Sequence, residues 1–229
     1  GVVGANGVVK ARGNVSLYSK GRVIDDGKSS TLVFAGKLKV VAVGPISLGT
    51  DISSLDAVAK GDGAIKIEEK DSIRLIYVVA KRGNLVVRSG EIKVGYVSAG
   101  GLGMQSDVSL FAKGDVIDDG NSWTVLSAEK LKVEATGSIR LGTNVNILDA
   151  TALGDGIIEI EENNNITLKS MIAGGGKVAV TAQSISLGKN VMSVDDVSLE
   201  ARGGDVIGRL AAKTVNLQAT DKVDVEGIG

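Results

Sequence analysis

The chain has no cysteine and no histidine, and it has one proline and 3% aromatic residues among 229 residues. Without Cys and His there is no disulfide, no Cys/His zinc site and no Ser-His-Asp or Cys-His catalytic system. Lys and Arg (26) nearly balance Asp and Glu (27), so no overall positive charge attracts nucleic acid. We therefore expect no cofactor, no metal site and no nucleic-acid partner.

Long hydrophobic runs are also missing. The longest apolar stretch, Ile73–Ala80, has the length of a strand and contains Arg74, whereas a membrane helix needs about 20 apolar residues. We therefore expect no membrane span. The chain begins at Gly1 without the basic and apolar regions of a signal peptide, as expected of a mature product or of an excised fragment.

Glycine, by contrast, is abundant: the chain has 32, and Val, Ile and Leu supply most of its apolar residues. β-branched residues favour strands, and so few aromatic side chains cannot anchor a conventional globular core. The composition indicates an all-β protein in which glycine marks the corners. We expect corner glycines, such as Gly44, Gly83, Gly137 and Gly176, to adopt positive φ angles.

A long internal repeat is the main feature of the sequence. Residues 15–95 align without a gap with residues 108–188, and 41 of the 81 aligned positions are identical. The segment VSLYSKGRVIDDG at Val15–Gly27, for example, returns as VSLFAKGDVIDDG at Val108–Gly120. Such identity is typical of a duplicated unit within a repeat architecture.

The repeat predicts the domain organisation. We expect one β-solenoid domain over residues 1–229, with 93-residue repeats at 15–107 and 108–196 and a partial third copy from residue 197. A unit of this length is too long for one structural turn, so it must contain shorter coils.

Within each long repeat, apolar and polar residues alternate in short segments. Such alternation is typical of a strand with one buried side, because successive side chains point to opposite faces. The first segments of successive coils begin at Val15, Leu38, Ile65, Leu85 and Val108. Third, less regular segments include Leu32/Phe34, Leu55/Ala57, Val97, Leu148/Ala150 and Val194. We therefore expect each long repeat to hold four coils of about 23 residues.

Three strands and three corners per coil make a triangular turn, and successive turns stack as parallel strands about 4.8 Å apart. The expected fold is all-β: a right-handed parallel β-helix (β-solenoid) with triangular coils of about 20–27 residues and roughly nine to ten coils. An antiparallel sandwich or barrel is the alternative, since Asp-Gly pairs typical of hairpins occur at Asp26-Gly27, Asp62-Gly63 and Asp155-Gly156.

Several coils share a further motif, Gly-x-U-x-Leu, in which U is apolar. It occurs, with one Gln for Gly, at Gly13–Leu17, Gly44–Leu48, Gly137–Leu141 and Gln183–Leu187. These coils resemble those of filamentous-haemagglutinin-type exoproteins, which are bacterial adhesins exported by two-partner secretion. The Asn-Pro-Asn-type motifs of that family's secretion domain are missing, because Pro45 is the one proline. The resemblance implies an extracellular, cell-surface shaft.

Two kinds of acidic cluster are candidate sites. Asp25-Asp26-Gly27 and its copy Asp118-Asp119-Gly120 carry ligands suited to calcium, but both are expected to form Asx turns at corners. The segments Gly61–Gly63 and Gly154–Gly156 are interpreted in the same way.

The adjacent acids Glu68-Glu69 and Glu161-Glu162 suggest a polysaccharide-cleaving β-helix enzyme, which uses paired carboxylates. Adjacent strand residues point to opposite faces, so these pairs are not expected to converge. Aromatic platforms for sugars are scarce too, with Trp123 the one tryptophan. The sequence therefore assigns no catalytic, cofactor-binding or metal-binding residue, and we expect the protein not to be an enzyme.

The surface charges are expected to form mixed, solvated faces, with Lys132 near Glu159 in the stack. We expect a structural or adhesive rod, extracellular or on the cell surface, with unidentified cell-surface or matrix receptors as partners. The apolar pattern runs to both ends, which suggests a piece of a longer rod. The alternatives are a subunit of an end-to-end filament, with end-to-end or lateral self-association, and a polysaccharide-active enzyme.

Overall fold

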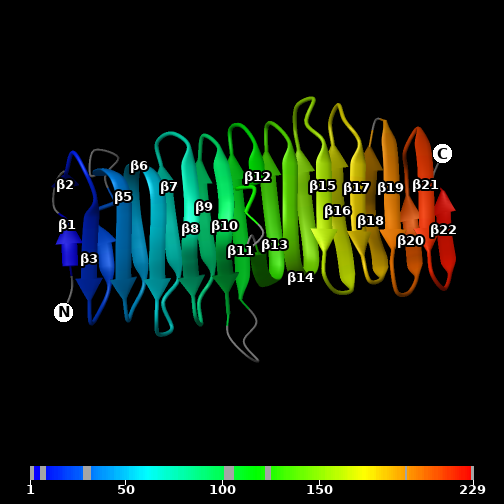
Figure 1. Cartoon of the computed structure of the whole chain (residues 1–229). Helices are drawn as coiled ribbons and strands as arrows, with labels where there is room; N and C mark the ends of the chain where they lie inside the picture. Colours follow the sequence, from blue (N-terminus) through cyan, green and yellow to red (C-terminus); the bar gives the residue numbers. More distant parts are fainter. Residues whose placement is uncertain are drawn as a thin grey trace.

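The computed structural model describes residues 3–5, 9–27, 32–100, 106–121, 125–193 and 195–227. These residues form 22 strands and no helix, and the strands join in one sheet that winds into a rod (Figure 1). The two ends of the chain lie at opposite ends of the rod. Trp123 and Val194 lie outside the described residues.

The strands are short in most coils and longer where one strand continues around a corner. The first ten are β1 (Val3–Ala5), β2 (Val9–Lys10), β3 (Val15–Ser19), β4 (Val23–Asp25), β5 (Val33–Ala42), β6 (Ile46–Ala59), β7 (Ile65–Glu69), β8 (Ile73–Ala80), β9 (Leu85–Ser89) and β10 (Ile92–Ala99). The others are β11 (Asp107–Ala112), β12 (Val116–Asp118), β13 (Val125–Ala135), β14 (Ile139–Ala152), β15 (Ile158–Glu162), β16 (Ile166–Ala173), β17 (Val178–Ala182), β18 (Ile185–Ser193), β19 (Asp196–Ala201), β20 (Val206–Leu210), β21 (Thr214–Ala219) and β22 (Val223–Gly227).

Two ladders of paired strands run along the rod, further short pairings join β2 with β5 and β10 with β13, and every described pairing between strands is parallel. Ladder one joins β3, β5, β6, β8, β10, β12, β14, β15, β17, β19 and β21. Ladder two joins β1, β4, β6, β7, β9, β11, β13, β14, β16, β18, β20 and β22. The result is a β-solenoid of about ten coils, as the sequence predicted, and the antiparallel alternative is wrong.

Some coils contain three runs of inward-facing residues. In the coil that begins at β8, Ile73 and Leu75 face inward, Ile76 and Tyr77 both face outward, and the inward pattern resumes at Val78. The outward pair coincides with a register shift against β6, where Leu55 pairs with Leu75 but Asp56 pairs with Tyr77. This irregularity turns one strand around a corner.

The register corrects the expected division of the long repeat. Val15 belongs to ladder one, because it pairs with Leu38, whereas its repeat equivalent Val108 belongs to ladder two, where it pairs with Leu85. The 93-residue unit therefore makes four and a half coils, and the expectation of four was wrong. Strands of the two ladders show the same alternation of apolar and polar residues. The sequence pattern alone therefore could not tell which strands belong to which ladder.

Coil lengths follow from the same register. Leu38 pairs with Leu55, 17 residues on, and Ile92 pairs with Val116, 24 residues on. The sequence pattern suggested that Ile65 lies one coil after Leu38. Ile65 pairs with Ile46 in ladder two, however, whereas Leu38 belongs to ladder one. Coils can differ in length because the difference is absorbed at corners, while the inward residues stay in register.

Glycine has a different role at the corners from the one expected. Among the described glycines, positive φ angles occur at Gly27, Gly100, Gly120 and Gly208. Gly44, Gly83, Gly137 and Gly176, for which they were expected, do not have them. Instead, corner glycines of successive coils stack directly on one another. A Cβ on Gly83 would lie 2.6 Å from the backbone of the preceding coil. The expectation of positive φ at these corners was therefore wrong, and close backbone approach is the reason for glycine there.

The core is a continuous stack of Val, Ile, Leu and Ala side chains inside the coils. It extends through both repeat copies, from Val23 in β4 to Leu210 in β20. No single coil can bury this apolar surface alone, because each inward layer is covered by the coils before and after it. Among the described residues, no helix could cross a membrane.

Candidate functional site

The acidic pairs occupy equivalent corners of the two repeats, and in each pair one carboxylate faces inward. Glu69 closes β7 at the end of the alternation that begins with Ile65 and Ile67, and its side chain is 7% exposed. Glu68 points outward, where Lys66 lies 3.3 Å and Arg88 3.6 Å away. The two carboxylates of the pair therefore do not converge, as strand geometry predicted.

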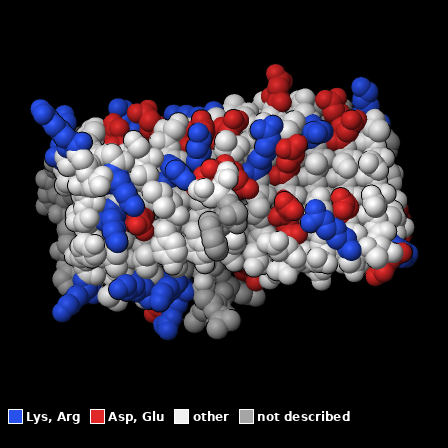
Figure 2. Space-filling view, viewed as in Figure 1, with Lys and Arg blue, Asp and Glu red and all other residues white. Residues whose placement is uncertain are grey.

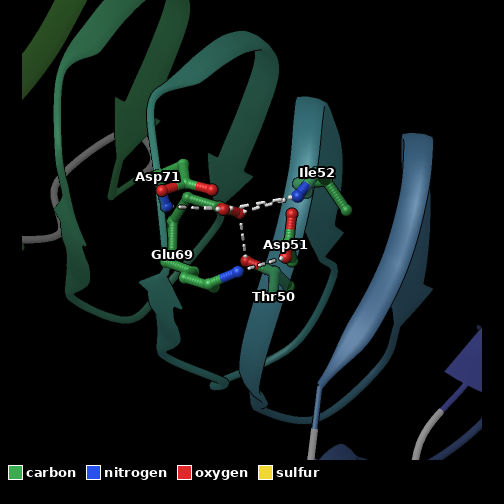
Figure 3. A network of polar contacts seen from close by, with 6 residues as sticks. Thr50, Asp51, Ile52, Glu69 and Asp71 are labelled. Carbon is green, nitrogen blue, oxygen red and sulfur yellow. Dashed lines mark hydrogen bonds and ion pairs between the residues drawn. The ribbon is translucent and has the colours of Figure 1, made fainter.

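Glu69 joins two successive coils (Figure 3). The hydroxyl of Thr50, in the preceding coil, donates a hydrogen bond of 2.7 Å to Glu69 Oε2. The backbone N–H of Ile52 donates to the same carboxylate at 3.2 Å, and the N–H of Asp71 donates to its Oε1 at 3.2 Å. Burial raises the pKa of Glu69, and the hydrogen bond from Thr50 opposes this. The carboxylate satisfies backbone groups at a corner where no strand partner reaches them.

The second repeat reproduces this arrangement. Glu162 accepts hydrogen bonds from the Thr143 hydroxyl at 2.8 Å and from the backbone N–H groups of Val145 and Asn164 at 2.8 and 2.9 Å. Burial raises the pKa of Glu162 as well. This role of Glu69 and Glu162 was not predicted, although the alternating pattern of the sequence places both residues at inward positions.

The Asp-Asp-Gly segments also lie at corners. In the first copy, the Gly27 N–H donates to Asp25 Oδ1 at 3.0 Å, which confirms the predicted Asx turn. Asp25 Oδ2 accepts a second hydrogen bond, at 2.5 Å, from the N–H of Gly49 in the next coil. Asp25 thus closes its own turn and fixes the position of the following coil.

In the second copy the two tasks are divided between neighbours. Asp118 Oδ2 accepts from the Gly142 N–H at 2.9 Å, whereas the turn is closed by Asp119, whose Oδ1 accepts from the Asn121 N–H at 3.1 Å. Arg74 reaches Asp119 Oδ2 at 2.8 Å and so attaches this turn to a coil much earlier in the sequence. The predicted Asx turn therefore forms in the second copy as well, one residue later than in the first copy.

Asp118 has a strongly perturbed carboxyl group. Its Oδ1 is buried and has no hydrogen-bond partner in the described part of the chain. Burial, together with the nearby negative charges of Asp119 and Glu161, raises the pKa of Asp118 to about 6. An acid with this pKa beside a second carboxylate is the arrangement here that most resembles a general acid. The oxygen without a partner is buried, however, and the other is bound by Gly142, so neither is available to a substrate.

The neighbouring charges are paired along the surface. An open groove runs from the second repeat into the partial third copy and is lined by Asp118, Arg140, Glu159, Glu161 and Arg202. Within it, Arg140 lies 2.9 Å from Glu159 and Arg202 lies 3.3 Å from Glu161. The first pair links adjacent coils and the second links coils two steps apart, and together they give the surface the mixed charge expected from the sequence.

The expected proximity of Lys132 to Glu159 was wrong. Lys132 belongs to β13 in ladder two, where it pairs in register with Asp149 and its Nζ lies 2.8 Å from Glu134. Glu159 belongs to β15 in ladder one. The step from Leu131 to Ile158 runs from one ladder to the other, as the step from Leu38 to Ile65 does in the first repeat, and this puts the two residues on different faces.

Glycoside hydrolysis requires two carboxylates about 5–10 Å apart. On ladder two, the outward acids Glu68 and Glu134 are separated by three coil steps, through Arg88 and Phe111. Three steps of about 4.8 Å place their backbones ~14 Å apart, so this pair does not fit that chemistry. In the described residues, no group of three acidic side chains is placed to hold a metal ion.

No protein-family model, curated protein or solved structure matches the chain.

Proposed function

We propose that this chain is a structural and adhesive rod, a shaft segment of a bacterial surface exoprotein of the filamentous-haemagglutinin type, and that it has no catalytic activity. The observation that carries the proposal is the uninterrupted core through about ten coils. Acids from the candidate enzyme and calcium clusters hold corners of that scaffold together: Glu69, Glu162, Asp25 and Asp118 each bind backbone N–H groups of a neighbouring coil. The Gly-x-U-x-Leu coils support the family.

The rod would act through its geometry. Parallel ladders and a close-packed interior make a stiff spacer, and its flat outer faces offer many weak contacts that add up when several rods bind together. In this proposal the chain lies outside the cell and presents binding surfaces to cell-surface or matrix receptors.

Attachment of protein-coated beads tests the adhesive role. Beads that carry the folded chain should adhere to host cells or extracellular matrix, and beads that carry the heat-unfolded chain should not. Polysaccharide incubated with the protein should keep its length. Depolymerisation by the wild type that is lost in Glu68→Gln or Glu161→Gln would support the enzyme and contradict the proposal of a non-catalytic rod. Equal adhesion of beads with folded and unfolded chains would contradict the adhesive role.

A second candidate, an end-to-end filament subunit, is favoured by the distribution of charge along the rod. Residues 1–100 carry 15 Lys or Arg and 9 Asp or Glu, a net charge of +6, whereas residues 101–229 carry 11 and 18, a net charge of −7. In Figure 2, Lys and Arg predominate over the N-terminal coils, and Asp and Glu become more frequent toward the C-terminal coils. Opposite charge favours head-to-tail association. Electron microscopy should then show filaments at low salt that shorten at high salt; single rods at both salt concentrations would exclude this candidate.

A further inference from the structure

Part of the outer face of ladder one is apolar, although this side of a solenoid coil normally carries polar residues. Tyr18, Val41 and Val58 follow one another in register in three successive coils, and all three point away from the core. Tyr18 is 62% exposed, and the two valines are partly buried. They form the start of an apolar strip on the surface.

Tyr77 bounds this strip on the far side. It pairs in register with Asp56, in the coil that carries Val58, and it is 45% exposed. Tyr96, in the next coil, stacks on one face of Tyr77 with ring centroids 5.0 Å apart and an interplanar angle of 13°. Tyr96 covers one face of the Tyr77 ring, and Tyr77 lines the same depression as Val41 and Val58.

These side chains line one depression, which we call the tyrosine slot: the floor is Val41 and Val58, the walls are Tyr18 and Tyr77, and the rim carries Lys39 and Lys60. The walls stand on coils three steps apart, so their backbones are ~14 Å from each other. Such a width admits one side chain between the rings together with the backbone that carries it.

The rim of the slot is cationic. Lys39 and Lys60 are exposed and form no ion pair with any residue that the structure describes. Lys60 directly follows β6, and Lys81 directly follows β8 in the next coil. Lys81 therefore adds a further positive charge beside the rim. Asp56 is the acid at the slot, and Lys37 lies 3.6 Å from it. The net charge of residues 1–100, +6, is positive like the rim of the slot.

We propose that the tyrosine slot binds an extended acidic peptide segment of a partner protein, with a Phe or Leu side chain on the valine floor and flanking carboxylates on the lysines. A saccharide fits less well, because hydroxyl groups over Val41 and Val58 would lose hydrogen bonds to water without replacement. An aromatic or aliphatic anchor in a small pocket with charged flanks is a common arrangement in peptide recognition. The proposal deepens the adhesive role and rests on it for the biological setting.

The second repeat supplies a natural control. At the equivalent positions it has Glu134 for Val41, Thr151 for Val58 and Ser170 for Tyr77. Phe111 replaces Tyr18, and Arg88 covers its ring at 4.2 Å. The slot is therefore a feature of the first repeat, and the same coil structure accepts the polar residues of the second.

Fluorescence anisotropy with the full chain tests the slot. The probe is a labelled Asp/Glu-rich peptide with a central Phe-Leu pair. We expect saturable binding that weakens about tenfold or more in the triple variant Val41→Glu, Val58→Thr, Tyr77→Ser, because the anchor loses its floor and one wall. Phe111→Ala, at the equivalent wall of the second repeat, should bind like the wild type, and circular dichroism checks that both variants are folded.

Two further probes identify the source of affinity. Binding should weaken as salt is raised and should be lost for a peptide with Ser-Ser in place of Phe-Leu. Unchanged affinity in the triple variant, equal binding of the Ser-Ser peptide, or binding of an anionic polysaccharide without any binding of the peptide would each overturn the proposal. So would concentration-dependent dimers that the triple variant abolishes, because the slot would then hold a second copy. If the peptide does not bind but protein-coated beads still adhere to cells, the slot proposal is wrong and the adhesive-rod proposal stands.

Discussion

At the scale of single residues, buried carboxylates hold the corners of this solenoid. Corners are where the ladders leave backbone N–H groups without a strand partner, and a side chain must satisfy them. Glu69 does so for Ile52 and Asp71, and Thr50 in turn donates to Glu69. Removing such an acceptor leaves several buried donors unsatisfied at once.

Glu69→Ala should lower the free energy of unfolding by about 1–3 kcal/mol, because the donors of Thr50 and Ile52 lose their acceptor. Glu69→Gln should cost less, since the amide keeps one accepting oxygen and removes a buried charge. Chemical denaturation measures both. Glu68→Ala is the matched control, as Glu68 is exposed, and a loss of stability equal to that of Glu69→Ala would contradict this role for Glu69.

Asp118 should make stability depend on pH. Its pKa is raised from 3.8 to about 6 by burial first and by neighbouring charges second. A group whose pKa is raised by folding stabilises the protein below the unfolded pKa, and this contribution is lost as pH rises through the folded pKa. The folded state should therefore lose about 1 kcal/mol between pH 4 and pH 7, once solvent screening of a partly exposed group is allowed for.

Asp118→Asn should remove this dependence, because Asn keeps an oxygen for the Gly142 N–H and cannot ionise. Thermal melts from pH 4 to pH 8 should show the variant gaining stability relative to the wild type as pH rises. Asp25→Asn is the comparison in the first repeat: it should lower the melting temperature at neutral pH, because both oxygens of Asp25 accept backbone hydrogen bonds. If the melting temperatures of Asp118→Asn and the wild type changed with pH in parallel, ionisation of Asp118 would not be the cause of the pH dependence.

At the scale of strands and corners, glycine stacking sets the distance between coils. Gly83 lies directly over the backbone of Gly63 and Ala64 in the preceding coil. Any side chain at Gly83 must push two coils apart, and this displacement spreads to the hydrogen bonds of both ladders.

Gly83→Ala should therefore destabilise the protein by about 1–3 kcal/mol. Gly13→Ala provides the control, since a Cβ on Gly13 meets nothing within 4 Å and should leave stability unchanged or raise it slightly. The comparison is made from denaturation midpoints of the two variants. Equal midpoints would show that the coils adjust to a Cβ at this corner without cost.

Strand positions and the inward residues were accessible from sequence because alternation reports burial directly. Ile65, Ile67 and Leu75 are buried as the pattern predicted. The order of strands across coils was not accessible, because corners change the coil length from 17 to 24 residues without changing the alternation. For the same reason the juxtaposition of Val58 with Tyr77, which depends on the register shift after Leu55, could not be predicted.

At the scale of the whole molecule, stability is passed from coil to coil. The core packing of each coil is with its neighbours, and surface ion pairs such as Arg74–Asp119 reach as far as the second coil. A defect in one layer should therefore weaken the adjacent layers most. The interior has no aromatic cluster in the described core, and its stability is spread over many aliphatic side chains of similar size.

Leu75→Ala, in a central coil, should cost about 2–5 kcal/mol, because Leu75 is fully buried between Leu55 and Val94. Hydrogen exchange should speed up most in β6, β8 and β10 and progressively less toward either end of the rod. Leu153→Ala is the control, as Leu153 is 68% exposed. Uniform acceleration along the chain would indicate one global unfolding unit in place of a coil-by-coil response.

The half coil in the long repeat has a consequence for how genes of this kind can change length. Adding or deleting one 93-residue copy by recombination keeps every inward residue inward, yet it moves all following coils onto the opposite ladder, as Val15 and Val108 already show. Surface features downstream, including any binding face, would then point to the other side of the shaft. Gain or loss of copies in pairs preserves their direction, so selection on surface presentation should favour even changes in copy number.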